Sequence, residues 1–255
     1  MKVNFCAEPK TTLPTFVDET KARVLYKNFI PENKTIYNPN VFVKEFDSLK
    51  YALNCLSQLT FDKKDLEKIK KYGATPVFAN GAQALKLAKD NDIKIKFEKV
   101  NRDDIHAQWV NAENKIIIND RYKNTKNLAE LYAISAAILH ELSHAKDKDD
   151  TSSIQEELNC LAMNAIAFNN FRNLNPELFK GQNSPIIEDG VELYTNLFFG
   201  NDENALAQRI KLKYGDLPPT SPQHPASDFI KKHFINNNSN INKQTPTATT
   251  TLQYH

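Results

Sequence analysis

The chain lacks the features that would place it outside the cell or in a membrane. It has only three cysteines in 255 residues, an odd number without CxxC spacing, which argues against a disulfide framework. Its start, MKVNFCAEP, has no apolar core long enough for a signal peptide, and no later run is long enough to span a bilayer. We therefore expect a cytoplasmic protein without membrane contact, with export by a route that needs no cleaved signal as the alternative.

An excess of charge of one sign is also absent. The sequence has 33 Lys and Arg residues against 31 Asp and Glu, a formal net charge of +2, and the two signs are evenly mixed. No basic surface is expected, so nucleic acid is not a predicted partner. With 40% hydrophobic residues the chain is large enough for a real core, and nothing in it indicates an oligomeric state.

The chain divides into a regularly patterned region and three less regular ones. Residues 1–77 are interpreted as an irregular lead-in with short helices, 78–175 as the core, 176–235 as a helical region, and 236–255 as a disordered tail rich in Asn and Thr. Apolar spacing outside the core predicts helices that begin near Phe46 or cover Asp65–Lys71, 187–199, 203–213 and 227–235, and a Pro-rich connector at 217–225.

Within the core, the order of elements is helix, strand, hairpin and long helix. Residues 81–89 have helical spacing, and 93–100 alternate as a half-buried strand. Two further strands, 106–110 and 115–119, are joined by a turn rich in residues that tolerate the left-handed conformation. No Pro or Gly interrupts residues 125–145, so a long helix is expected there.

The long helix carries the most informative motif, His140-Glu141-Leu-Ser-His144. Residues four apart share one helical face, so both imidazoles can reach one metal ion, while Glu141 is placed to take a proton from a metal-bound water. Six histidines in a chain of this length produce such a motif by chance only about once in a hundred sequences.

The helical wheel of residues 128–147 supports this interpretation. One side is mostly apolar and is expected to pack on a sheet, whereas both histidines lie roughly opposite among small residues, where a second helix can approach closely. The apolar side comprises Leu128, Leu131, Tyr132, Ser135, Ile138, Leu139 and Leu142, and the small residues are Ala133, Ala136 and Ala137.

The motif and its context resemble the zincin superfamily of zinc metallopeptidases, and His-Glu-Leu-Ser-His-Ala is most similar to its gluzincin branch. The order of elements extends the resemblance over roughly residues 78–170. It implies an α+β fold in which a small mixed sheet packs on the active-site helix, with additional helices at both ends. It also implies a Zn²⁺ cofactor, Glu141 as general base, and a peptide or protein substrate held by an edge strand.

In the gluzincin branch a downstream glutamate is the third metal ligand, and Glu156, Glu157 and Glu188 are the candidates. A polar turn near residue 150 would bring residues 156–157 of a returning helix level with His144, so spacing favours the first two. Glu157 lies nearer the buried stripe and is our choice. Glu156 points nearly away from it, and with Ser153 it fits a capping box.

Other polar residues have weaker claims to a role at the metal. Asp147 follows His144 on the same face and could orient a ligand imidazole. Cys160 is interpreted as a small core residue, and Tyr194 as a core or rim residue rather than an oxyanion donor. His106, His224 and His233 are given no role.

The sequence therefore predicts a zinc metallopeptidase with His140, His144 and Glu157 as metal ligands and Glu141 as the catalytic residue. One alternative is a binding or regulatory module that keeps the zincin-like fold without turnover, although an intact Glu141 argues against it. The other is a helical interaction protein in which the motif is accidental.

Overall fold

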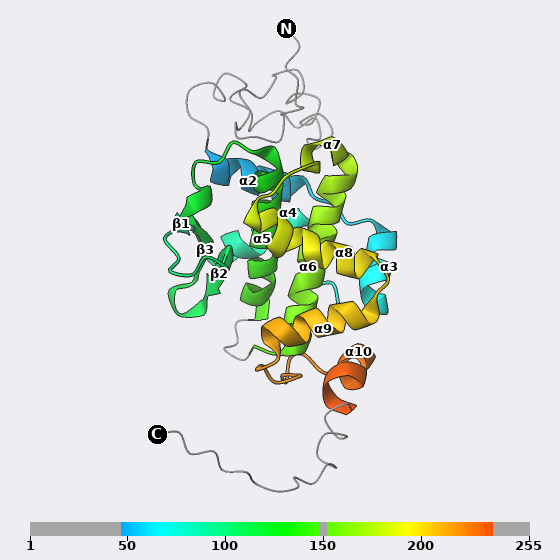
Figure 1. Cartoon of the computed structure of the whole chain (residues 1–255). Helices are drawn as coiled ribbons and strands as arrows, with labels where there is room; N and C mark the ends of the chain where they lie inside the picture. The colour runs from blue at the N-terminus through cyan, green and yellow to red at the C-terminus, as the bar shows by residue number, and fades with distance from the viewer. Residues whose placement is uncertain (1–46, 148–151, 237–255) are drawn as a thin grey trace, which may run out of the picture.

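Two long helices, α5 (Leu128–Asp147) and α6 (Ile154–Leu174), pack side by side in the centre of the molecule (Figure 1). The structure, a computed structural model, describes residues 47–147 and 152–236. Helix α5 is buried along almost its whole length, so every polar side chain in it needs a partner. The hydroxyls of Ser135 and Ser143 donate to the carbonyls of Leu131 and Leu139 one turn earlier, which satisfies both.

The beginnings of these helices follow local capping rules. The side-chain oxygen of Asn127 accepts from the backbone N–H of Ala129, and Ser153 accepts from the backbone N–H of Glu156 as the N-cap of α6. Helix α6 ends at Asn175, directly before Pro176, which cannot continue the hydrogen-bond ladder of a helix. The expected returning helix is therefore present.

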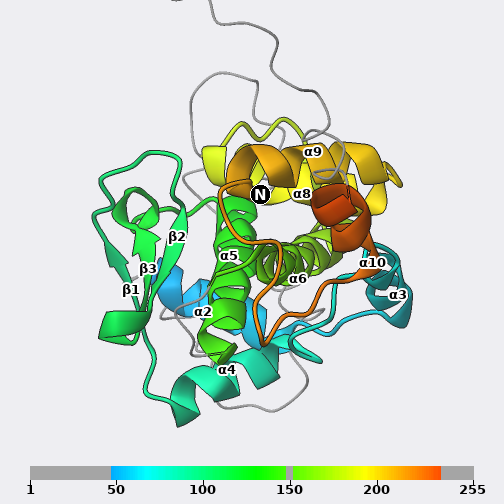
Figure 2. The same cartoon turned by 90° about the horizontal axis from the view of Figure 1, so that it is seen from below.

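A three-stranded mixed sheet lies on one side of α5 (Figure 2). Its order is β1 (Lys94–Glu98), β3 (Lys115–Asn119), β2 (Ala107–Val110), with β1 parallel and β2 antiparallel to β3. A short 3-10 turn ends at Asn114, whose φ of +49° is the left-handed conformation expected of the hairpin turn. Strand β2 is an edge of the sheet and packs against α5.

Helices from the first part of the chain cover another face of α5. Helix α2 (Ser48–Gln58) and α4 (Gly81–Asp90) both pack on α5, and α3 (Lys63–Lys71) lies beside α6. The start of α4 approaches α2 so closely that a Cβ on Gly81 would lie 1.8 Å from the carbonyl oxygen of Leu56. Only glycine fits at this contact.

Of the later helices, α8 (Leu193–Phe199) and α9 (Glu203–Tyr214) lie against α6 on the side away from α2 and α4, and the first π-helical segment (Ile186–Glu192) packs on both α5 and α6 (Figure 2). This π-helical segment takes the place of the α-helix expected at the start of residues 187–199. The other elements are α7 (Pro176–Phe179), α10 (Asp228–Ile230) and a second π-helical segment (Lys231–Ile235).

The described chain is thus mixed α+β, mostly helical with one small mixed sheet. Residues from α2, the sheet and α5 share one core, so part of the region before residue 78 packs directly on the central helix. Residues 1–46 of the expected lead-in and almost all of the expected disordered tail lie outside the described residues. Among the residues described, no helix is long and apolar enough to cross a membrane.

Candidate metal centre

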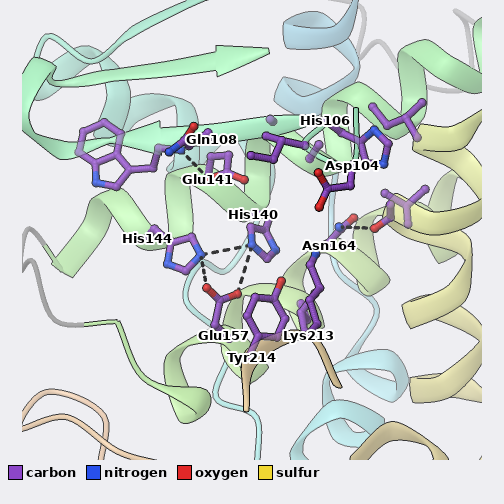
Figure 3. A pocket seen from close by; sticks show the side chains of 18 of the residues that line it. Asp104, His106, Gln108, His140, Glu141, His144, Glu157, Asn164, Lys213 and Tyr214 are labelled. Atoms are coloured by element: carbon purple, nitrogen blue, oxygen red, sulfur yellow. Dashed lines mark hydrogen bonds and ion pairs between the residues drawn. The ribbon is translucent and has the colours of Figure 1, made fainter. Parts of the chain in front are cut away.

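The two histidines of the motif point into a cleft beside α5 with their Nε2 atoms facing one another (Figure 3). These atoms are 3.2 Å apart, and both side chains are nearly buried. Their separation by one helical turn is what brings the rings together. A hydrogen bond between the two nitrogens would require one of them to carry a proton. A cation between them could instead be bound by the lone pairs of both unprotonated nitrogens.

Glu157 completes the group from the first turn of α6. Its Oε1 is 3.5 Å from Nε2 of His144, and its Oε2 is 3.7 Å from Nε2 of His140. Glu157 Oε2 is buried and has no hydrogen-bond partner among the described residues. Burying a carboxylate oxygen without a hydrogen bond costs free energy, so this atom also favours a bound cation at the site.

The spacing of these donors is close to that around a small tetrahedral ion. Donor atoms at 2.0–2.1 Å from zinc in a tetrahedron are separated by about 3.3 Å. The two Nε2 atoms are 3.2 Å apart, that of His144 is 3.5 Å from Oε1 of Glu157, and that of His140 is 3.7 Å from Oε2 of the same carboxylate. Two imidazoles and one carboxylate, with a fourth direction open to the cleft, could therefore hold such an ion with little movement.

The surroundings of the two imidazoles shift their pKa values in opposite directions. Burial, followed by the charge of His144, holds the pKa of His140 well below its ordinary value. Burial also acts to lower the pKa of His144, but contacts with Cys160, Glu156 and Glu157 outweigh it and raise that pKa. The shift at His140 favours the neutral ring that a metal ligand requires, whereas His144 would have to release a proton on binding a metal.

Glu156 lies behind His144 rather than beside the group of donors. Its Oε1 is 2.7 Å from Nδ1 of His144, the ring nitrogen that does not face His140. The expectation that it points away and caps its own helix is wrong for the side chain, although Ser153 does cap the Glu156 backbone N–H. A carboxylate on the distal nitrogen fixes the ring and its tautomer. Glu188, the third candidate, is exposed and does not line the cleft.

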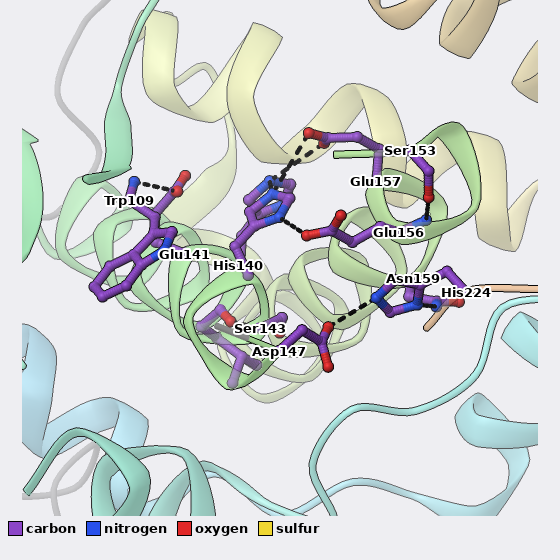
Figure 4. Close-up of polar contacts among 12 residues, drawn as sticks. Trp109, His140, Glu141, Ser143, Asp147, Ser153, Glu156, Glu157, Asn159 and His224 are labelled. Atoms are coloured by element: carbon purple, nitrogen blue, oxygen red, sulfur yellow. Dashed lines mark hydrogen bonds and ion pairs between the residues drawn. The ribbon is translucent and has the colours of Figure 1, made fainter. Parts of the chain in front are cut away.

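Asp147 does not contact either motif histidine in the way the sequence suggested. Its Oδ2 lies 2.8 Å from Nε2 of His224, whose Nδ1 lies 3.3 Å from the side-chain amide of Asn159 on α6 (Figure 4). His224, to which no role was given, thus joins the end of α5 to the start of α6. The sequence positions gave no indication of this contact because 77 residues separate its partners.

The Pro-rich connector that contains His224 also caps α6. The carbonyls of Pro218 and Pro219 accept from the backbone N–H groups of Ile154 and Gln155 at 2.9 and 3.1 Å. N–H groups in the first turn of a helix have no carbonyl partner within the helix, so the connector supplies the acceptors that these two lack. This turn carries Glu156 and Glu157.

Glu141 faces the edge strand β2. Its Oε2 accepts from the backbone N–H of Trp109 at 2.7 Å (Figure 4). Burial raises the pKa of Glu141, and the charge of Glu157 raises it further. A carboxyl with a raised pKa, one hydrogen bond and access to a cleft is suited to accept and return a proton.

The donors lie in a cleft of about 430 Å³ between β2, α5, α6, the first π-helical segment and the end of α9. Two lining residues that sequence analysis missed are Lys213 and Tyr214, and Figure 3 shows both beside Glu157. Burial and the charge of Glu157 raise the pKa of Tyr214 well above its ordinary value. Its hydroxyl is therefore protonated and able to donate.

A signal for these two residues was present in the spacing of α9. Leu206 and Ile210 form its buried stripe, and positions 213 and 214 continue that stripe by a further turn. Lys213 itself is exposed and Tyr214 is half-buried, so this spacing places the two residues at the mouth of the cleft rather than in the core.

The remaining candidates lie near the site or in the core. Cys160 is buried, and burial raises its pKa to about 12, as expected of a core thiol, although its sulfur also approaches His144 and Glu156. Tyr194 is buried in the core around α6 and does not line the cleft. His106 lines the cleft, and its Nδ1 lies 2.9 Å from the Tyr122 hydroxyl and 2.8 Å from the Arg121 guanidinium.

Comparison with known proteins identifies no relative. No family model matches the sequence, and neither a curated protein nor a solved structure is similar to it. What the chain does must therefore be inferred from its own residues.

Proposed function

We propose that this chain is a zinc-dependent peptidase with a zincin-like centre, in which His140, His144 and Glu157 hold the metal. The observation that carries the proposal is the convergence of two imidazole nitrogens and one carboxylate. The nitrogens are 3.2 Å apart, each lies 3.5–3.7 Å from one of the two Glu157 oxygens, and one of these oxygens is buried without a hydrogen-bond partner. Bound zinc supplies Lewis acidity, which lowers the pKa of water and polarises a carbonyl oxygen.

Glu141 is the general base in this proposal. It lines the same cleft as the three donors, and its carboxylate is held by the Trp109 N–H rather than by a cationic partner. It takes a proton from the attacking water and passes it to the leaving amine. Tyr214, which lines the cleft beside Glu157 and hydrogen-bonds its carboxylate, can turn its hydroxyl to a polarised carbonyl oxygen.

Strand β2 is suited to hold an extended peptide. The Asn119 N–H donates to the carbonyl of His106 at 2.9 Å, so His106 and Asn119 form a hydrogen-bonded pair of the hairpin. Residues alternate along an antiparallel edge, and Ala107 and Trp109 therefore direct their main-chain groups away from β3. A peptide added along this edge would run beside Glu141.

The proposal is tested by purifying wild type and Glu141→Gln and measuring both zinc content and cleavage of a peptide library by mass spectrometry. We expect one zinc per chain in both proteins and cleavage by wild type only, with a loss of at least about a hundredfold, typical of removing a general base. Glu188→Gln, a change at an exposed glutamate outside the cleft, is the matched control.

Full activity in Glu141→Gln would refute the assigned base. Zinc in both proteins without cleavage by either would favour a zincin-like binding module instead. A wild type without zinc, after growth in zinc-supplemented medium, would contradict the metal site and leave a helical interaction protein as the better account.

A further inference from the structure

Lys213 is the least expected side chain in the cleft. It follows the buried Ile210 by one turn of α9, and although the residue as a whole is exposed, its side chain lines the cleft. The cleft that it lines also contains Glu141 and Glu157. The apolar stripe of α9 is therefore followed by a cation at the cleft of the proposed reaction centre.

The ammonium group is held by aromatic rings rather than by a carboxylate. Its Nζ lies 5.0 Å from the ring centroid of Tyr214 and 5.7 Å from that of Tyr194. In the described part of the chain, no carboxylate lies within 4.0 Å of it. Contact with two aromatic rings limits the positions that the ammonium group can adopt. It leaves the N–H donors of the group available to an anion.

The second cation that lines the cleft is already neutralised. The Nε of Arg102 donates to Oδ1 of Asp104 at 3.0 Å, and its NH2 group donates to Oδ2 of the same carboxylate. Lys213 is thus the cation in the cleft that lacks a direct anionic partner among the described residues. Loss of hydration lowers its pKa, and the more distant charges of Glu157 and Glu141 offset this only in part.

We propose that Lys213 binds a carboxylate of the substrate, so that the cleft selects peptides with an anionic group close to the bond that is cut. This inference rests on the proposed peptidase function and specifies its substrate class. The carboxylate can be the C-terminal group of a short peptide or the side chain of Asp or Glu. The chemistry of recognition is the same for both, an ammonium–carboxylate hydrogen bond inside a cleft.

The test compares wild type, Lys213→Met and Lys213→Glu on paired octapeptide libraries. One pair differs only in a free or amidated C-terminus, and the other has Asp and Glu replaced by Asn and Gln, so the two sources of the carboxylate are separated. We expect wild type to favour one anionic library. Lys213→Met should lower kcat/KM for that library about 10- to 100-fold through KM, the effect of losing one charge-assisted hydrogen bond, and so abolish the preference for it over the neutral library.

Lys213→Glu should favour peptides with Lys or Arg at the same position. Lys211→Met, which removes an exposed lysine of the same helix outside the cleft, should behave as wild type. A wild type that cuts neutral and anionic libraries equally would overturn the inference. An equal loss on both libraries in Lys213→Met would also overturn it, because Lys213 would then act on the reacting carbonyl.

Binding of the same labelled peptides to Glu141→Gln, measured by fluorescence anisotropy, separates this inference from the peptidase proposal. If wild type cuts nothing but Glu141→Gln binds anionic peptides in a Lys213-dependent way, the carboxylate site is supported and the peptidase proposal fails. If wild type cuts anionic and neutral peptides equally, the peptidase proposal is supported and the carboxylate site fails.

Discussion

At the scale of single residues, two adjacent glutamates take different positions around one imidazole. Glu157 faces Nε2 of His144, and Glu156 contacts Nδ1 of the same ring at 2.7 Å. Consecutive residues on a helical wheel are about 100° apart. The wheel therefore assigned Glu156 and Glu157 to different faces, but it could not show that His144 lies between the two carboxylates. The choice of Glu157 as donor agrees with this geometry, whereas the role of Glu156 depends on a ring 12 residues away.

The contact of Glu156 with His144 leads to a prediction for Glu156→Gln. The amide keeps the size of the side chain but loses the charge that fixes the ring, so zinc should still bind, about 10- to 100-fold more weakly. The measurement is competition for zinc with a chromophoric chelator. Unchanged affinity would mean that the contact does not orient the ligand, and Glu188→Gln is the control for removing one negative charge.

At the scale of elements, the site depends on how the end of α5 is fixed to the start of α6. The chain between these helices includes residues 148–151, which lie outside the described part. The described links are the Asp147–His224–Asn159 contacts and the capping of α6 by Pro218 and Pro219. Helix α5 could be predicted from its unbroken local pattern, but this connector could not, because nothing local relates residues 217–225 to helices far earlier in the chain.

Replacement of His224 tests the importance of this link. His224→Ala leaves the partly buried Asp147 carboxylate and the Asn159 amide without the imidazole, so the free energy of unfolding should fall by about 1–3 kcal/mol. Urea unfolding of the zinc-free protein measures it. His233→Ala, which removes a histidine paired with Glu203 away from the cleft, is the comparison for loss of a histidine ion pair. If His224→Ala unfolds as wild type does, the connector does not stabilise the two helices.

At the scale of the whole molecule, the cleft collects residues from segments spread between Arg102 and Tyr214. Local periodicity and the hairpin turn predicted the order of helices and strands, and the resemblance implied the mixed α+β class, which the structure has. The sequence did not predict Lys213 and Tyr214 in the cleft, because that placement depends on the packing of α9 across α6 and not on any motif. The π-helical start of residues 186–199 was also missed, since its apolar spacing resembles that of an α-helix.

Because the proposed donors come from both central helices, zinc should stabilise the entire fold. Binding only to the folded state at 100 times the Kd adds about 2.7 kcal/mol to the free energy of unfolding. Scanning calorimetry should therefore show a lower Tm after treatment with a chelator and recovery on adding zinc. The same cycle in His140→Ala should leave Tm unchanged, and an equal response of both proteins would place the stabilising zinc elsewhere.

The most direct test of the central claim is elemental analysis of purified wild type, Glu157→Ala and Glu188→Ala for zinc per chain. The donor geometry predicts one zinc in wild type and in Glu188→Ala, and its loss from Glu157→Ala after dialysis. Absence of zinc from wild type, or full retention by Glu157→Ala, would contradict a centre formed by His140, His144 and Glu157.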